Sequence, residues 1–136
     1  MKNRSSNATR VYLICLMLFW LVFGLITTFD PPLMDLFQTP AGVAAKTAFS
    51  DLVWRHDGLD IIAVCILLFA LLQQKAISAG MIRATAFATL MPAIAIAYSL
   101  LATPYWNVLF TGAGAACLAF VIWGFILAGG KTDAVA

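Results

Sequence analysis

The residues best suited to chemistry lie together in one short stretch, 51–60, which reads DLVWRHDGLD. On an unbroken helix, at about 100° per residue, Asp60 falls between His56 and Asp57, so the three side chains share one face. A carboxylate one turn from an imidazole can orient it and tune its titration near neutrality, which suits general acid–base catalysis. We therefore take His56, Asp57 and Asp60 as the candidate catalytic residues.

Three interpretations of this group stay open. In the first, His56 and Asp60 hydrogen-bond to polar residues of neighbouring helices and only fix the packing. In the second, they act as acid and base on a lipid-soluble substrate. In the third, His56, Asp57 and Asp60 bind a metal. The chain has no other histidine and no glutamate, so we predict no metal site, and the sequence names no cofactor.

The elements that must position these residues belong to a membrane protein. The chain has 136 residues, of which 63% are hydrophobic and 10% charged, and its mean hydropathy is +0.98. A soluble domain is about one-quarter charged, and a soluble core of this length could not bury so much apolar surface. The composition excludes a soluble enzyme, a nucleic-acid-binding protein and a disordered chain, and it makes the lipid bilayer the expected partner.

Hydropathy predicts an all-α fold, a bundle of four antiparallel transmembrane helices within a single domain, 1–136. The spans cover about 11–29, 52–72, 84–101 and 108–127, with a long loop at 30–51. The second span must begin near Leu52, because its apolar part, 59–72, contains Asp60 and is too short by itself. We expect the first span to be a retained helix, since its exit lacks the small residues of a signal-peptide cleavage site.

The distribution of charge predicts the orientation of the bundle. Six of the eight basic residues flank one side of the spans and five of the six aspartates lie on the other. Basic residues favour the cytoplasmic side, so both termini should be cytoplasmic. We expect a bacterial inner (plasma) membrane, with the long loop on its outer face. The basic residues on the predicted inner side are Lys2, Arg4, Arg10, Lys75, Arg83 and Lys131.

The long loop contains two signals for short helices. Asp30-Pro31-Pro32 and Thr39-Pro40 each combine a capping residue with a proline suited to a first helical turn. We expect helices at 33–37 and from 41 to about 53, the second running directly into the second span. The segment is apolar, so it should lie on the membrane surface or fold over the mouth of the bundle, either as a plain connector or as a lid.

Small and special residues within the spans predict how the helices pack. Pro92 lies in the middle of the third span and should kink it. Gly112 and Ala116 are four residues apart, a spacing that allows helices to approach closely, and we interpret it as a contact within the bundle. Tyr12 should lie at the inner membrane interface, where amphipathic aromatic rings collect.

Polar residues gather at the outer ends of the spans, so a site should lie at the outer mouth of the bundle. The candidates for substrate binding there are Arg55, Tyr98, Trp54 and Asp30. Arg55 would contact an anion or a carbonyl group. Arg55 also follows Asp51 by one helical turn, with the acid on the N-terminal side, which predicts a surface ion pair between the two.

The layout of the chain resembles that of the small four-helix DoxX-like membrane proteins. The likeness rests on an apolar first helix that ends in Phe29-Asp30-Pro31, a bent outer connector, and Arg55-x-x-Gly58 at the start of the second span. The resemblance implies a four-helix bundle and a quinone or membrane-redox context. His56-Asp57 beside Arg55 departs from that pattern, so no functional residue is carried over.

Two classes of function follow. The favoured one is an accessory or assembly subunit of a larger membrane complex, because the chain is small and lacks a recognisable reaction signature; its partners would be other membrane subunits or a second copy of itself. The alternative is a small enzyme that performs acid–base chemistry on an apolar substrate, such as a quinone, an isoprenoid or a polyketide-like molecule, at the outer-leaflet mouth of the bundle.

Overall fold

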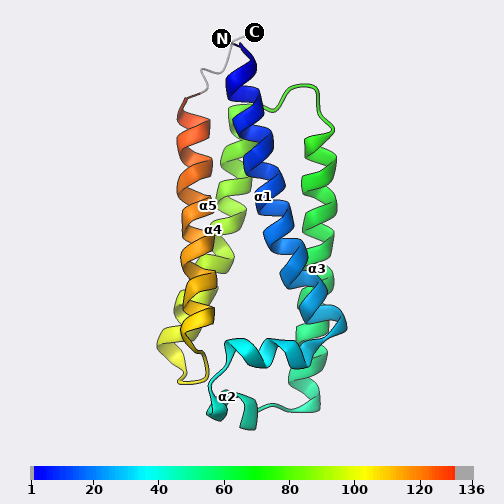
Figure 1. The fold of residues 1–136 in the computed structure, drawn as a ribbon, viewed down its shortest axis with the longest axis vertical. Helices are drawn as coiled ribbons and strands as arrows, with labels where there is room; N and C mark the ends of the chain where they lie inside the picture. Colours follow the sequence, from blue (N-terminus) through cyan, green and yellow to red (C-terminus); the bar gives the residue numbers. More distant parts are fainter. Residues whose placement is uncertain (1, 131–136) are drawn as a thin grey trace.

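The computed structural model describes residues 2–130, which are almost entirely helical and contain no β-strand (Figure 1). The long helices are α1 (Lys2–Phe29), α3 (Ala48–Leu72), α4 (Ala79–Ala102) and α5 (Val108–Gly129). A 3-10 helix, η1 (Pro31–Phe37), and a short helix, α2 (Pro40–Ala44), connect α1 to α3. Lys131 and Asp133, which enter the charge argument for orientation, lie outside the described residues.

Three of the described helices are long and apolar enough to cross a membrane, namely Asn7–Phe29 within α1, all of α4 and all of α5. The protein is therefore a small membrane protein with an all-α fold. The helix α3 is not among these three, because its first half carries the charged residues Arg55, Asp57 and Asp60.

The connector between α1 and α3 folds differently from the prediction. The expected single helix from 41 to about 53 is wrong, because α2 ends at Ala44 and α3 begins separately at Ala48. The break is held by Thr47, whose backbone is extended and whose side chain accepts a hydrogen bond from the backbone N–H of Ser50, while the hydroxyl of Ser50 accepts one from the N–H of Thr47. Such a capping box starts a new helix because it satisfies two backbone donors that have no partner within the helix.

The long helices pack as two pairs, α1 with α3 and α4 with α5, and these pairings are far more extensive than any contact between α3 and α4. The first pair approaches most closely at Gly58. A Cβ atom there would meet the hydroxyl of Thr28 and lie 2.7 Å from the Thr28 backbone nitrogen. Only glycine permits this crossing, because any side chain would push α1 and α3 apart.

A core joins the two pairs near the ends of the chain. Tyr12 is its centre, with no exposed surface and with its ring 5.4 Å from that of Trp123 in an edge-on contact. Gly124 makes room for the ring, since a Cβ there would lie 2.6 Å from the Tyr12 hydroxyl oxygen. The side chain of Tyr12 therefore packs inside the bundle and does not face the lipid. The buried members of this core are Tyr12, Leu13, Leu16, Leu68, Leu72, Ile82 and Ala128.

At the opposite end, segment 36–42 is fastened to the loop 103–107, and we call this contact the clasp. The side-chain amide of Asn107 donates to the carbonyls of Leu36 and Gln38, at 2.7 and 3.0 Å. The backbone N–H of Thr39 donates to the carbonyl of Tyr105 at 2.8 Å. The connector thus lies across the helix ends and links the α1–α3 pair to the α4–α5 pair (Figure 1).

The helix α5 turns a different face inward from the one that the spacing of small residues indicates. Gly112 is exposed and a Cβ on it would have nothing within 4 Å, so the predicted contact of Gly112 and Ala116 within the bundle is wrong. The small residues that α5 buries are Ala113, Gly114, Cys117, Gly124 and Ala128. Gly114 packs against Ile96 of α4.

Candidate functional site

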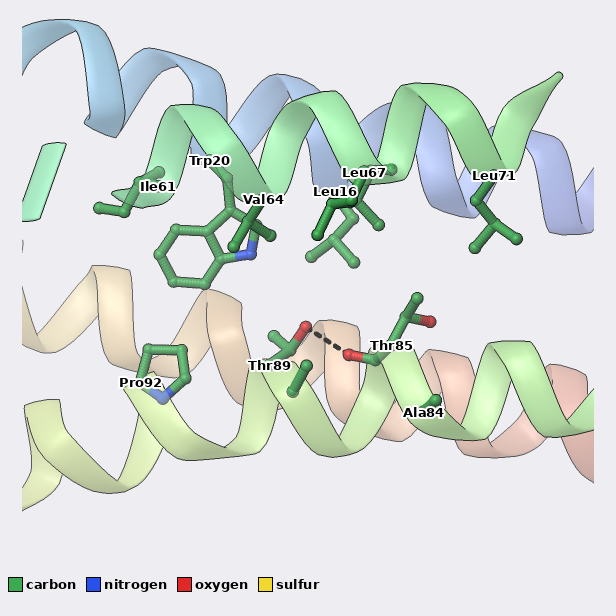
Figure 2. A pocket seen from close by; sticks show the side chains of 12 residues that line it. Leu16, Trp20, Ile61, Val64, Leu67, Leu71, Ala84, Thr85, Thr89 and Pro92 are labelled. Atoms are coloured by element: carbon green, nitrogen blue, oxygen red, sulfur yellow. Dashed lines mark hydrogen bonds between the residues drawn. The ribbon is translucent and has the colours of Figure 1, made fainter. Parts of the chain in front are cut away.

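A cleft lies between the two helix pairs, with α3 on one side and α4 on the other (Figure 2). Its apolar part has a volume of about 470 Å³. The helices α3 and α4 supply its two walls, and Leu16 and Trp20 of α1 contribute from behind. The wall residues are Ile61, Val64, Leu67, Leu68 and Leu71 of α3 and Ala84, Thr85, Ala88, Thr89 and Pro92 of α4.

The cleft continues towards the clasp as a second part of about 320 Å³. Trp20, Ile61 and Pro92 line both parts, so the two parts adjoin. Met34 of η1 is almost fully buried and lines the second part, which places the connector over this end of the cleft. The polar side chains that line the second part are Thr27, Asp57 and Ser99, together with the indoles of Trp20, Trp54 and Trp106.

Helical periodicity explains how one face of α3 lines the whole cleft. Residues 54, 57, 61, 64, 68 and 71 recur at intervals of three and four, so they form one stripe along the helix. On α4, the side chains of Ala84 and Ala88 are small and therefore fill little of the cleft. The hydroxyls of Thr85 and Thr89 donate to carbonyls of their own helix, each at 2.8 Å, so they add little free polarity.

The structure divides the predicted catalytic group. Asp57 lines the cleft, whereas His56 and Asp60 do not. The Nδ1 atom of His56 lies 3.4 Å from Oδ2 of Asp60, and these side chains are 74% and 72% exposed. Asp60 precedes Leu67, a wall residue, by seven residues and so lies on nearly the same helix face, although it does not line the cleft itself.

Of the predicted substrate-binding residues, only Trp54 lines the cleft. Its ring lies 5.6 Å from that of Trp106 in an edge-on contact. Tyr98 is 72% exposed on α4 and lies outside the cleft. Asp30 occupies the capping position of η1, where its backbone carbonyl, not its side chain, accepts a hydrogen bond from Leu33.

Arg55 has a partner that the sequence does not indicate. Its Nη1 donates to the carbonyl of Thr28 at 2.7 Å, near the C-terminal end of α1. The predicted ion pair with Asp51 is therefore wrong among the described residues, because Asp51 instead lies 3.6 Å from Nζ of Lys46. Lys46 also contacts Asp35 at 2.7 Å, and this hydrogen bond raises the pKa of Lys46 above its usual 10.5.

Sequence reasoning missed most of the cleft wall. Trp20, Thr89 and Pro92 lie within apolar helices and carry no spacing that points to a ligand. The one available signal is the pair of small residues, Ala84 and Ala88, two turns and one turn before Pro92. Proline has no N–H group, so the carbonyl of Ala88 lacks its regular helical donor.

Residues 2–130 contain no group of three or more His, Cys, Asp or Glu side chains placed to hold a metal ion. Cys15, Cys65 and Cys117 are free thiols. The chemistry that the arrangement offers is therefore binding within an apolar space that has one carboxylate, that of Asp57, and two indoles near one end.

No family model, curated protein or solved structure matches this chain. The resemblance to DoxX-like proteins stays a prediction, and the function has to be argued from the residues themselves.

Proposed function

We propose that this small membrane protein binds a lipid-like molecule in the cleft between its two helix pairs. The observation that carries the proposal is the cleft, whose apolar part of about 470 Å³ falls within the roughly 300–1,000 Å³ usual for small-molecule sites. Helices in a bilayer associate largely through van der Waals packing. An unfilled gap between them forfeits those contacts, and an apolar molecule in the cleft would restore them.

The proposal includes the topology. We take α3 as a fourth membrane crossing, because it runs beside α1 along much of its length. Its charged residues lie level with the end of α1, since Gly58 packs against Thr27 and Thr28, and this is where lipid headgroups would be. Arg10, Lys75 and Arg83 lie near the opposite end, which supports cytoplasmic termini and, with them, a clasp on the outer face of a bacterial inner membrane.

A ligand would enter from the side. The core around Tyr12 closes the cleft near the chain termini and η1 covers the other end, whereas α3 and α4 leave a lateral opening between them. An opening of this kind communicates with the lipid and not with water, so a molecule dissolved in the bilayer could reach the site without leaving the membrane.

The test is mild detergent extraction followed by native mass spectrometry of the bound molecules. We expect the wild-type protein to retain a lipid-like molecule at a ratio near one, and Ala88→Phe to lose it, because the new ring would occupy the cleft. Gly112→Leu is the matched control, since Gly112 faces away from the cleft and has nothing within 4 Å of its Cβ position. Equal retention by wild type and Ala88→Phe, or no retention by either, would refute binding in the cleft.

An accessory or assembly subunit remains a second candidate, and one observation favours it. The outward face of α5 exposes small residues at Gly112, Ala115 and Ala119, and such faces allow another helix to approach closely. If this candidate is right, wild-type protein extracted from its native membrane will migrate with other polypeptides or as an oligomer, and Gly112→Leu will release it. Migration as a monomer would count against this second function and leave the first intact.

The acid–base enzyme is the weaker alternative. His56 and Asp60 would be its acid and base, yet neither lines the cleft. Because a catalytic group must be within hydrogen-bond reach of the reacting atoms, this separation favours binding over turnover for a molecule held in the cleft.

A further inference from the structure

We propose that the molecule in the cleft is an amphiphile with a cationic ammonium head, which is bound at Asp57, and an apolar chain that lies along α3 and α4. The inference rests on the proposed function and deepens it by naming the chemistry of the ligand. Three observations support this inference. One end of the cleft has a carboxylate and aromatic rings, whereas the lining of the other end is apolar.

The first argument is the charge of the lining. Asp57 is the only ionisable carboxyl or basic side chain among the described residues that line either part of the cleft. Within residues 2–130, Asp57 forms no hydrogen bond or salt bridge: Arg55 is bound to the carbonyl of Thr28, and the adjacent imidazole of His56 pairs with Asp60. The carboxylate of Asp57 is exposed at the edge of this part of the cleft, so it would attract a cationic head and repel an anionic one.

The second argument is the aromatic surroundings of that carboxylate. Trp54 and Trp106 line the same part of the cleft, and Trp106 stacks on Phe110 at a ring distance of 4.0 Å. The face of an indole attracts cations, and the attraction grows when water is excluded. A carboxylate beside two indoles is a combination that recognises ammonium groups, whereas a quinone or a fatty acid would gain nothing from the charge.

The third argument is the shape. The cleft changes from polar to apolar along its length, from Asp57 and Ser99 near the clasp to Leu71 and Ala84 near the core. From Ser99 to Ala84 the helix α4 rises by about 22 Å at 1.5 Å per residue, which suits a long alkyl chain. The head would therefore lie level with the headgroup region of the bilayer and the chain within its hydrocarbon region.

The ammonium could belong to a free long-chain amine or to a phospholipid head, and the experiment separates these sources. Hexadecylamine, hexadecanol, palmitic acid and phosphatidylethanolamine are each titrated into the delipidated, full-length protein in detergent, and binding is measured by native mass spectrometry. We expect hexadecylamine to bind about tenfold more tightly than hexadecanol, the size of one charge-assisted hydrogen bond, and palmitic acid to bind most weakly. Binding of phosphatidylethanolamine in place of hexadecylamine would assign the ammonium to a phospholipid.

Two variants of α3 test the assignment to Asp57. Asp57→Asn keeps the size of the side chain and should reduce the preference for the amine over the alcohol to about onefold. Asp60→Asn is the matched control, because it makes the same chemical change one turn along the helix at a residue that does not line the cleft. The control should keep the preference of the wild type. Thermal unfolding of both variants checks that each is folded.

The outcomes separate the two proposals. Binding of all single-chain probes with equal affinity, a preference for palmitic acid, or an equal loss of preference in Asp57→Asn and Asp60→Asn would overturn the cationic ligand while leaving the cleft as a binding site. Failure of every probe to bind, with Ala88→Phe indistinguishable from wild type, would overturn the proposed function itself.

Discussion

Replacing Gly58 with alanine should force α1 and α3 apart and destabilise the fold. The added Cβ would lie 2.7 Å from the backbone nitrogen of Thr28 and 2.5 Å from the Thr27 hydroxyl oxygen. A side chain can rotate away, but a backbone atom cannot. To reach ordinary van der Waals contact, at roughly 3.5 Å, the two helices must separate by about 0.8 Å at this point.

The magnitude follows from two terms. Overpacking of a close contact costs about 1–3 kcal/mol. The separation also stretches the hydrogen bond from Arg55 to the Thr28 carbonyl, which is 2.7 Å long and joins the same two helices. We therefore expect Gly58→Ala to lower the free energy of unfolding by about 2 kcal/mol, or roughly thirtyfold in the equilibrium constant.

The assay is reversible unfolding in mixed micelles of a mild detergent and sodium dodecyl sulfate, followed by circular dichroism. Gly112→Ala is the matched control, because it makes the same change in helix propensity at a position with nothing within 4 Å. The control should be within about 0.5 kcal/mol of wild type, as is usual for surface substitutions. If Gly58→Ala were as stable as Gly112→Ala, the close crossing of α1 and α3 at Gly58 would be refuted.

Three further substitutions probe the ends of the helices. Asn107→Ala removes two hydrogen bonds of the clasp and the cap of α5. The substitution should lower the free energy of unfolding by about 1–2 kcal/mol. Amide hydrogen exchange should become faster within 36–42 and stay unchanged in the core around Tyr12. Arg10→Ala removes two hydrogen bonds to carbonyls at the end of α3, at 2.8 and 3.0 Å; exchange should rise at 70–75, and Arg10→Lys should restore it only in part. The pKa of Lys46 is raised in the folded protein by its hydrogen bond to Asp35, so the pair stabilises the fold below about pH 10.5 and the contribution is lost as the pH rises through the folded pKa. Stability should therefore fall as the pH rises above about 10.5 in wild type and less so in Lys46→Met, and parallel pH profiles would contradict this.

Local sequence signals predicted where the helices lie, because hydropathy and capping act within a few residues. The end of α1 at Phe29, just before Asp30-Pro31-Pro32, is of this kind. The break at Thr47 was missed, since the apolar pattern continues across it and only the paired hydroxyls of Thr47 and Ser50 decide the geometry.

The rotation of each helix about its own axis could not be predicted in this way. Gly112 stands out in the sequence because of Ala116, yet it faces outward. Gly58 lies among charged residues and is the position where α1 and α3 meet. Which side of a helix contacts its neighbour depends on the partner surface, and a single sequence does not specify that surface.

In the candidate site, too, the sequence predicts which residues lie near one another on a helix but not which of them face the cleft. Periodicity predicts that His56, Asp57 and Asp60 share one face of a helix, but it cannot say which of them faces a cleft that forms only between helices distant in the sequence. The histidine–carboxylate pair with the more suggestive spacing, His56 and Asp60, does not line the cleft. The carboxyl that lines the cleft is that of Asp57.

The pairing of the helices has a consequence for how the protein is made. Each pair is contiguous in the chain, α1 with α3 and then α4 with α5, and only the short stretch 73–78 separates them. On the proposed topology, the first hairpin can enter the bilayer while the second is still being synthesised. The cleft comes into being only when the second hairpin docks and the clasp closes. A molecule that binds there favours the docked arrangement by mass action, so the supply of ligand during biogenesis would govern how much protein matures.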